Sequence, residues 1–126
     1  MSKSVVYSEQ APEPIGPYSQ AIQCGNLLFV SGQIALARST GAMITSSIEE
    51  ETKQVMANIQ SVLAAAGLDF SHVVKTSIFL KDMNNFPLVN QIYGTFFSTT
   101  PPARETVEVS RLPKDANVEI SCIAAR

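Results

Sequence analysis

The chain has 126 residues and a net charge of -2, with 16% charged and 45% hydrophobic residues. This length predicts one domain over residues 1–126, able to bury roughly two-thirds of its unfolded surface. So few charges indicate that some apolar surface is covered by further copies of the chain. The sequence has no Lys/Arg cluster typical of nucleic-acid binding, and no apolar run approaches the ~20 residues of a membrane span.

The amino terminus and the cysteines indicate a compartment. The first residues lead into an expected strand and not into the apolar core of a signal peptide. Cys24 and Cys122 are too few for a disulfide framework, and we interpret them as buried free thiols. We therefore expect a cytoplasmic protein.

The first expected elements are a short strand at residues 5–7 and a proline-rich loop at 11–17. This loop either lays Tyr18 against a cleft or leaves it half-buried with its hydroxyl bonded to backbone. Residues 19–23 and 27–31 flank Gly25-Asn26, which predicts a β-hairpin.

The second strand of that hairpin is apolar on both faces over residues 27–30, which favours a central strand covered on both sides. It ends in Ser31-Gly32. A glycine there either admits a ligand close to the backbone or simply ends the strand in a turn.

Two helices are expected. Ser47 and Glu50 form a capping-box pattern, apolar residues recur at helical spacing over 48–66, and Gly67 supplies the stop. A β-branched strand follows at 73–80. The only histidine, His72, stands at its entrance, where a structural or exposed role is expected.

The second helix is capped by Asn84 or Asn85 and tolerates Pro87 in its first turn. Its expected buried stripe consists of Val89, Ile92, Tyr93, Phe96 and Phe97. Asn90 lies off this stripe, where its amide can bond to a neighbouring loop.

Residues 101–111 begin with two prolines and then alternate as in a strand. Arg104, Thr106 and Glu108 fall on one side and Glu105 on the other. An arginine presents a rigid fork of donors that binds a carboxylate through two parallel hydrogen bonds. Spacing alone leaves open that Arg104 is simply an exposed residue at a strand end.

The last strand, residues 118–124, follows after a short turn, which predicts an antiparallel neighbour for the 101–111 strand. Glu119 is then expected near Arg104. The alternative for Glu119 is a strand carboxylate paired with a surface lysine.

The order of elements predicts an α+β fold with a single mixed sheet and two helices packed on one face. The opposite face keeps apolar residues that nothing in one chain covers, so we expect self-association. One histidine and two distant cysteines give no metal site or nucleophilic triad, and no Gly-rich phosphate loop is present. An enzyme built from this chain would use no cofactor and no metal, only water, a carboxylate and fixed hydrogen bonds.

Several short motifs resemble the RidA (YjgF) family, in order and at nearly unbroken spacing over almost the whole chain. They are Ile15–Ser19, Phe29–Gln33, Ala65–Leu68, Val74–Thr76, Leu80–Asp82, Pro102–Arg104, Val107–Val109, Leu112–Asp115 and Val118–Ile120. The resemblance implies a RidA/chorismate-mutase-like fold that assembles as a homotrimer with ligand clefts between subunits. It also implies hydrolysis of reactive enamines and imines (2-aminoacrylate, 2-iminopropanoate and 2-iminobutanoate) to 2-keto acids and ammonia.

The same resemblance implies roles for individual residues. Arg104 is expected to bind the substrate carboxylate, and Glu119 to position the attacking water. The expected substrate-binding residues are Tyr18, Ser31, Gly32, Asn90, Arg104 and Thr106. Thr106 is a departure, because many relatives carry cysteine there, and the segment 98–102 is shorter than in some relatives, which leaves substrate size open.

Two other functions fit the same residues. One is a non-catalytic trimeric module that binds small carboxylates and regulates a partner. The other is the ribonuclease or translation-inhibitor activity described for some relatives, against which the acidic charge balance argues, because phosphate contacts need Lys and Arg.

Overall fold

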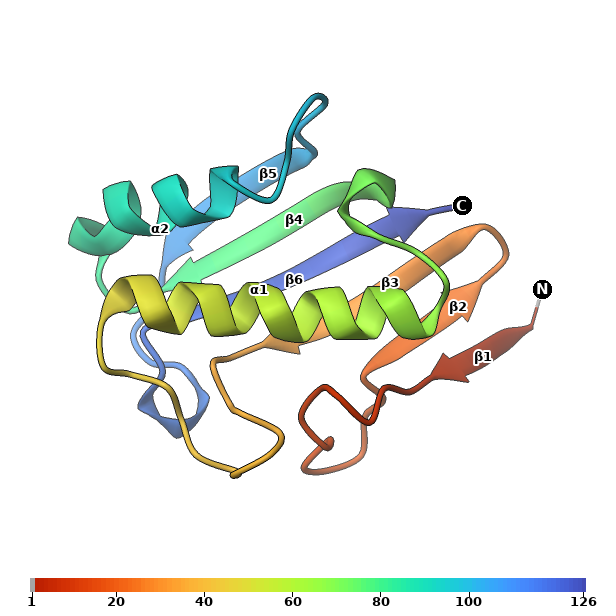
Figure 1. Ribbon diagram of the computed structural model, residues 1–126, viewed down its shortest axis with the longest axis horizontal. Helices are drawn as coiled ribbons and strands as arrows, with labels where there is room; N and C mark the ends of the chain where they lie inside the picture. The colour runs from red at the N-terminus through yellow and green to blue at the C-terminus, as the bar shows by residue number, and fades with distance from the viewer. Residues whose placement is uncertain (1) are drawn as a thin grey trace.

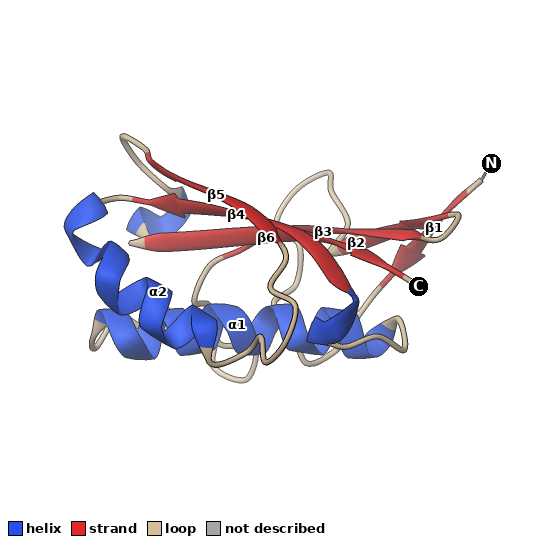
Figure 2. Cartoon of the chain, turned by 90° about the horizontal axis from the view of Figure 1, so that it is seen from above, coloured by secondary structure: helices blue, strands red, loops and turns tan. Residues whose placement is uncertain are grey.

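The computed structural model describes residues 2–126, which form a six-stranded mixed sheet in the order β1-β2-β3-β6-β4-β5. The strands are β1 (Lys3–Val6), β2 (Ala21–Cys24), β3 (Leu27–Gln33), β4 (Val73–Leu80), β5 (Ala103–Glu108) and β6 (Val118–Ala125). Helix α1 (Ile48–Ala65) and helix α2 (Phe86–Gly94) both pack on one side of the sheet (Figures 1 and 2). The predicted α+β fold is confirmed at this level.

Local signals set most element boundaries. Ser47 caps α1 by accepting the Glu50 amide at 3.1 Å, and Gly67 follows the helix with a φ of 73°. Asn85 stands at the start of α2 with no side-chain capping bond, and Pro87 lies in the first turn as expected. The helix ends at Gly94, so Phe96 and Phe97 of the predicted stripe lie beyond it.

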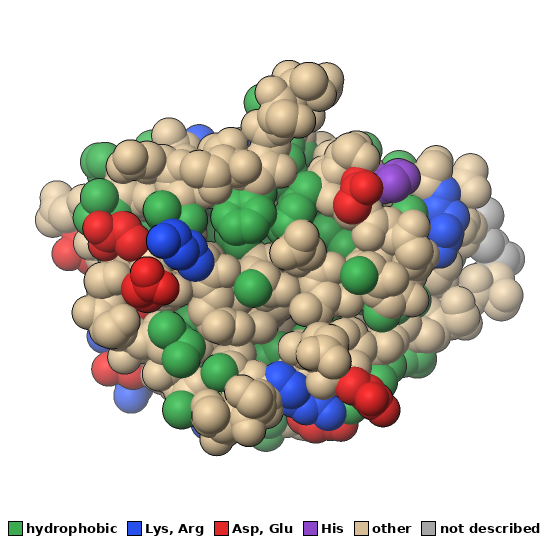
Figure 3. Space-filling view, in the orientation of Figure 1, with side chains coloured by type: hydrophobic (Ala, Val, Ile, Leu, Met, Phe, Trp, Pro, Cys, Tyr) green, Lys and Arg blue, Asp and Glu red, His purple; other side chains and the backbone are tan. Residues whose placement is uncertain are grey.

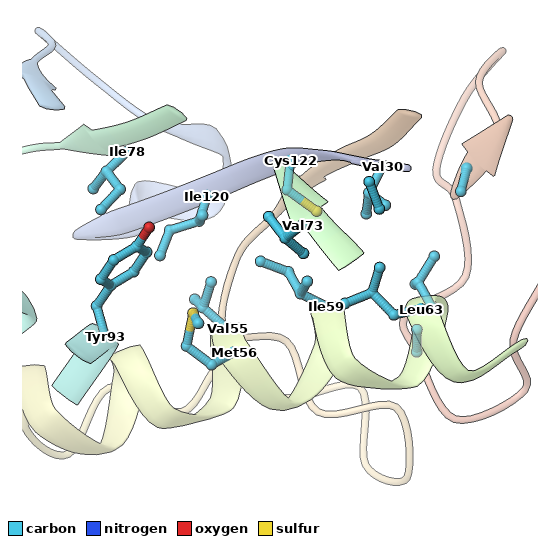
Figure 4. Packing of buried hydrophobic residues seen from close by; sticks show 14 of the residues in the cluster. Val30, Val55, Met56, Ile59, Leu63, Val73, Ile78, Tyr93, Ile120 and Cys122 are labelled. Carbon is cyan, nitrogen blue, oxygen red and sulfur yellow. The ribbon is translucent and has the colours of Figure 1, made fainter. Parts of the chain in front are cut away.

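The hydrophobic core lies between α1 and the sheet (Figure 4). From α1, Val55, Ile59 and Leu63 point toward Ile120 and Cys122 on β6, and all five are buried. Burial raises the pKa of the Cys122 thiol to about 12, so this cysteine is a core residue with no accessible thiolate.

Among residues 2–126, neither α1 nor α2 covers the other side of the sheet (Figure 2). The β2–β3 hairpin forms as predicted, but the two-sided covering expected for β3 is absent in the protomer. Leu27 and Phe29 remain 39% and 43% exposed there, and Val107 on β5 is 42% exposed. Among residues 2–126, no helix is long and apolar enough to cross a membrane.

Candidate functional site

The two residues expected to carry the chemistry, Arg104 and Glu119, come from strands that are not neighbours. β5 pairs in parallel with β4, and β6 lies between β3 and β4 in antiparallel register. The predicted antiparallel pairing of residues 101–111 with residues 118–124 is therefore wrong. The cause is the β4–α2–β5 crossover, which returns the chain to the outer edge of β4 and leaves the inner edge for β6.

Arg104 lies on the helix side, at the β5 edge of the sheet. Its Nη1 donates to Asn90 Oδ1 of α2 at 2.7 Å. The guanidinium also lies over the rings of Phe86 and Tyr93, with its carbon 5.4 and 5.0 Å from the ring centroids. Within residues 2–126 it makes that one hydrogen bond, so most of its five donors are available to a ligand.

The surroundings of Arg104 leave its charge unneutralised. Glu105 points to the opposite face of β5, as predicted, where its carboxylate contacts Ser77 and Lys75 Nζ, the latter at 3.0 Å. Thr106 points to the same face as Arg104. Its Oγ1 is buried, and no group within residues 2–126 bonds to it. Within residues 2–126, this face of β5 therefore carries an arginine with no ion pair and a buried hydroxyl with no hydrogen-bond partner.

Glu119 lies on the uncovered side of the sheet, on the wall of a cavity of about 550 Å³. Tyr18, Ser31 and Gly32 line the same cavity, so the structure brings together four of the seven predicted site residues. Burial raises the pKa of the Glu119 carboxyl above its ordinary value. No hydrogen bond or ion pair to it exists within residues 2–126, which leaves both oxygens available for a water molecule or a ligand.

Gly32 provides the space that the Glu119 carboxylate occupies. The register between β3 and β6 shifts between Val30 and Gln33, which marks a β-bulge at this point. A Cβ added to Gly32 would lie 2.6 Å from Glu119 Oε2. Gly32 thus leaves room for the Glu119 carboxylate, a contact that neither sequence interpretation named, and the expected approach of a ligand to its backbone stays a prediction.

Tyr18 shows parts of both expectations made for it. It lines the cavity and is 52% exposed, while its hydroxyl accepts a hydrogen bond from the Ile15 amide at 3.3 Å. Ser31 donates its hydroxyl to the Ser19 carbonyl at 2.6 Å. These bonds hold the proline-rich loop against the end of β3 and so shape one wall of the cavity.

Three polar residues that support the site were not identified from the sequence. Buried Gln20 and partly exposed Arg38 hold the proline-rich loop: Gln20 Nε2 donates to the Pro12 carbonyl at 2.9 Å, and Arg38 Nη1 to the Ala11 carbonyl at 2.5 Å. Buried Glu51 accepts two hydrogen bonds from Asn117, just before Glu119. The available signal was the place of Glu51 on the apolar stripe of α1, where a carboxylate must have a partner.

Together, the fold and these two groups of residues define a small α+β protein with a guanidinium at one sheet edge and a confined carboxylate on the uncovered sheet face. A model of the family described as Endoribonuclease L-PSP matches residues 8–126. The chain therefore belongs to this family, the RidA (YjgF) family that the sequence motifs resemble.

Similar proteins with names or solved structures agree with this assignment. The chain is 49% identical over 122 residues to a RutC family protein of Pyrococcus horikoshii, covering 97% of each chain. It is 44% identical over 124 residues to the 2-iminobutanoate/2-iminopropanoate deaminase of Mus musculus, covering 98% of this chain and 92% of the other.

Two solved structures are similar over nearly the whole chain. A conserved Rid family protein from Yersinia pestis superposes with a TM-score of 0.97 at 48% identity, covering 99% of this chain and 100% of the other. E. coli TdcF with bound serine superposes with a TM-score of 0.94 at 35% identity, covering 98% of each chain.

Proposed function

We propose that this protein hydrolyses 2-aminoacrylate, 2-iminopropanoate and 2-iminobutanoate to 2-keto acids and ammonia. Deamination of reactive intermediates is the activity named for relatives 44% identical or more. The observation that carries the proposal is the pair of uncompensated groups: the Arg104 guanidinium with free donors, and the Glu119 carboxylate in its cavity. The first suits a substrate carboxylate and the second suits a water molecule.

The site is completed by assembly into a homotrimer. Arg104 and Glu119 lie on opposite sides of one sheet, so a single protomer does not bring them to the same substrate. The uncovered face also exposes Leu27, Phe29 and Val107, which a second copy would bury. In the proposed cleft, one subunit contributes Arg104, Asn90 and Thr106, and its neighbour contributes the cavity with Glu119.

The proposed reaction needs only positioning and proton transfer. Arg104 binds the substrate carboxylate through two parallel hydrogen bonds. With the imine protonated, Glu119 accepts a proton from a water molecule as the water oxygen adds to the imine carbon, which gives a neutral carbinolamine. Glu119 then gives this proton to the nitrogen and takes the proton of the carbinolamine hydroxyl as the C–N bond breaks, so the C=O bond forms and ammonia leaves. An enamine such as 2-aminoacrylate first takes a proton on its terminal carbon to become the imine.

The test is an assay in which an amino-acid oxidase or a dehydratase generates the imine and keto-acid release is followed above the spontaneous rate. In Arg104→Ala we expect a loss of about 100-fold or more in kcat/KM, because an aligned charged pair of hydrogen bonds is removed. Arg104→Lys keeps the charge but not the fork, so its loss should be intermediate. An Arg104→Ala protein with full activity and an unchanged melting temperature would end the assignment.

A non-catalytic module that binds small carboxylates is the second candidate. It is favoured by the serine held in the TdcF structure. Ligand binding without imine turnover would support it. Ribonuclease activity has less support: in the face shown in Figure 3, Lys and Arg side chains of residues 2–126 are scattered among Asp and Glu without forming a basic patch.

A further inference from the structure

The turn before β6 holds two consecutive residues in an uncommon backbone conformation. Lys114 and Asp115 have φ angles of 54° and 57°, in the left-handed region. This conformation costs a non-glycine residue roughly 1–2 kcal/mol, and it persists only where surrounding structure enforces it. Two such residues in succession indicate that the position of this turn matters.

Contacts on both sides hold the turn in place. Lys81 Nζ pairs with Asp115 Oδ1 at 2.7 Å, and the Lys81 amide donates to the Asn117 carbonyl at 3.0 Å. The buried Glu51 carboxylate accepts from the Asn117 amide at 2.7 Å and from Asn117 Nδ2 at 2.8 Å. The backbone at Lys114 is therefore fixed by its neighbours, while the Lys114 side chain takes no part in fixing it.

The Lys114 side chain lies where two cavities meet. It lines the 550 Å³ cavity that holds Glu119 and also a second cavity of about 320 Å³. Both cavities share the walls Pro12, Glu13, Ile15 and Leu36. The two spaces therefore adjoin at Lys114 and the shared walls. The larger one alone exceeds what a substrate with a methyl or ethyl side chain requires.

The two basic side chains that line these cavities differ in their contacts. Arg38 lines the second cavity, but its guanidinium is bonded to Ala11 and Tyr7 and lies 3.8 Å from the Glu13 carboxylate. Lys114 has no hydrogen bond or ion pair within residues 2–126. Lys114 is exposed and lines both cavities, so its ammonium is accessible to a ligand there.

We propose that Lys114 forms a second anion-binding point that selects substrates by the far end of their side chain. The substrate class is a 2-imino acid with a second carboxylate on its side chain. With the imine carbon at Glu119 and the first carboxylate on Arg104 of the neighbouring subunit, the second carboxylate reaches the junction of the cavities. This inference rests on the proposed deaminase function and adds its substrate class.

The experiment compares two imines, generated by an amino-acid oxidase from glutamate and from 2-aminobutyrate, with catalase present. Lys114→Gly removes the cation while keeping a residue for which the left-handed conformation carries no strain, so its melting temperature should equal or exceed that of the wild type. We expect it to lower kcat/KM for the glutamate imine about tenfold and for the 2-aminobutyrate imine less than about threefold. Lys114→Arg should retain the preference, and Lys53→Met on the exposed side of α1 should affect neither substrate.

The possible outcomes distinguish a failure of this inference from a failure of the proposed deaminase function. Equal losses for both imines would mean that Lys114 attracts every substrate alike and would overturn its selective role. A Lys114→Gly protein with the wild-type kcat/KM for both imines would overturn the selective role too. A wild-type protein that turns over the 2-aminobutyrate imine but not the glutamate imine would also overturn it. A wild-type protein that accelerates neither imine would instead contradict the deaminase function itself.

Discussion

The two faces of the sheet differ in what covers them and in what they offer a ligand. On the helix side, α1 and α2 cover the strands, and residues such as Ile78, Leu80 and Ile120 are fully buried. On the other side, Leu27 and Phe29 remain partly exposed. The covered face supplies the stability of the protomer, and the uncovered face carries the apolar surface that we propose to lie between subunits.

The two halves of the candidate site follow the same division. Arg104 stands on the helix side against Asn90 and two aromatic rings, with unused donors. Glu119 stands on the uncovered side in a cavity that raises its pKa. Within residues 2–126 Arg104 pairs with no anion and Glu119 with no cation, which fits the proposal that two copies of the chain form one cleft.

The largest expected effect is on imine turnover when Arg104 and Glu119, the two halves of the candidate site, are substituted in different chains. Arg104→Ala and Glu119→Gln should each lose at least about 99% of imine turnover as pure proteins. When the two variants are unfolded together in equal amounts and refolded, some clefts combine an intact Arg104 with an intact Glu119. Random mixing in a cyclic trimer then restores about a quarter of the wild-type activity.

The control for this mixture is the same two variants combined after folding, without exchange of subunits, which should stay inactive. If each cleft drew both residues from one protomer, the refolded mixture would remain inactive as well. That result, with mixed assemblies demonstrated by native mass spectrometry, would contradict the shared cleft.

The second-largest effect is expected from a substitution of Gly32, which lies against the Glu119 carboxylate. Gly32→Ala places a methyl carbon 2.6 Å from Glu119 Oε2, which is too close, so the carboxylate must move. A displacement of about 1 Å at a catalytic group costs on the order of 100-fold in kcat. The matched control is Gly94→Ala at the end of α2, where an added Cβ meets no atom within 4 Å. Equal kcat values for the two variants would show that the position of Glu119 is unimportant.

The sequence predicted the local elements well because their signals are local. Ser47 and Gly67 bracket α1, and Gly25-Asn26 turns the β2–β3 hairpin, each through hydrogen bonds or φ angles formed within a few residues. The place of β5 depends instead on which edge of β4 remains available after the α2 crossover. No pattern within residues 101–124 contains that information, so the short turn wrongly favoured a hairpin.

The candidate site was predictable to a similar extent. The motifs indicated Tyr18, Ser31, Gly32 and Glu119, which line one cavity. The supporting residues Gln20 and Arg38 were missed, because polar side chains that bond to backbone carbonyls of a distant loop have no periodic signature. The expected proximity of Glu119 and Arg104 failed within the protomer for the same reason that β5 was misplaced.

A change on the uncovered face should disturb assembly before it disturbs folding. Phe29→Lys puts a charge at the centre of the surface proposed to be buried between subunits, so the molar mass in solution should fall to that of the protomer. Activity should fall about tenfold or more with it, because the clefts are lost. Leu88→Lys is the control, since Leu88 is similarly exposed at 39% but lies on α2. Circular dichroism should show both variants folded, and a trimeric, active Phe29→Lys protein would contradict the use of this face.

The smallest expected effect is the pH dependence of stability that Glu119 causes on the uncovered face. Because burial raises the folded-state pKa of Glu119, the protonated carboxyl is the form that the cavity favours. Its contribution to stability is complete below the unfolded value of about 4.3, and it is lost as the pH rises through the folded-state pKa. At neutral pH the ionised carboxylate therefore lowers stability, and Glu119→Gln should raise the melting temperature by about 1–3 °C.

This gain in melting temperature should shrink to zero as the pH falls below the ordinary range of glutamate. Wild-type turnover should decline over the same acidic range, because the base becomes protonated. Paired thermal melts and pH–rate profiles measure both trends, and a stability difference that grows on acidification would place Glu119 in an ion pair and not in an uncompensated cavity.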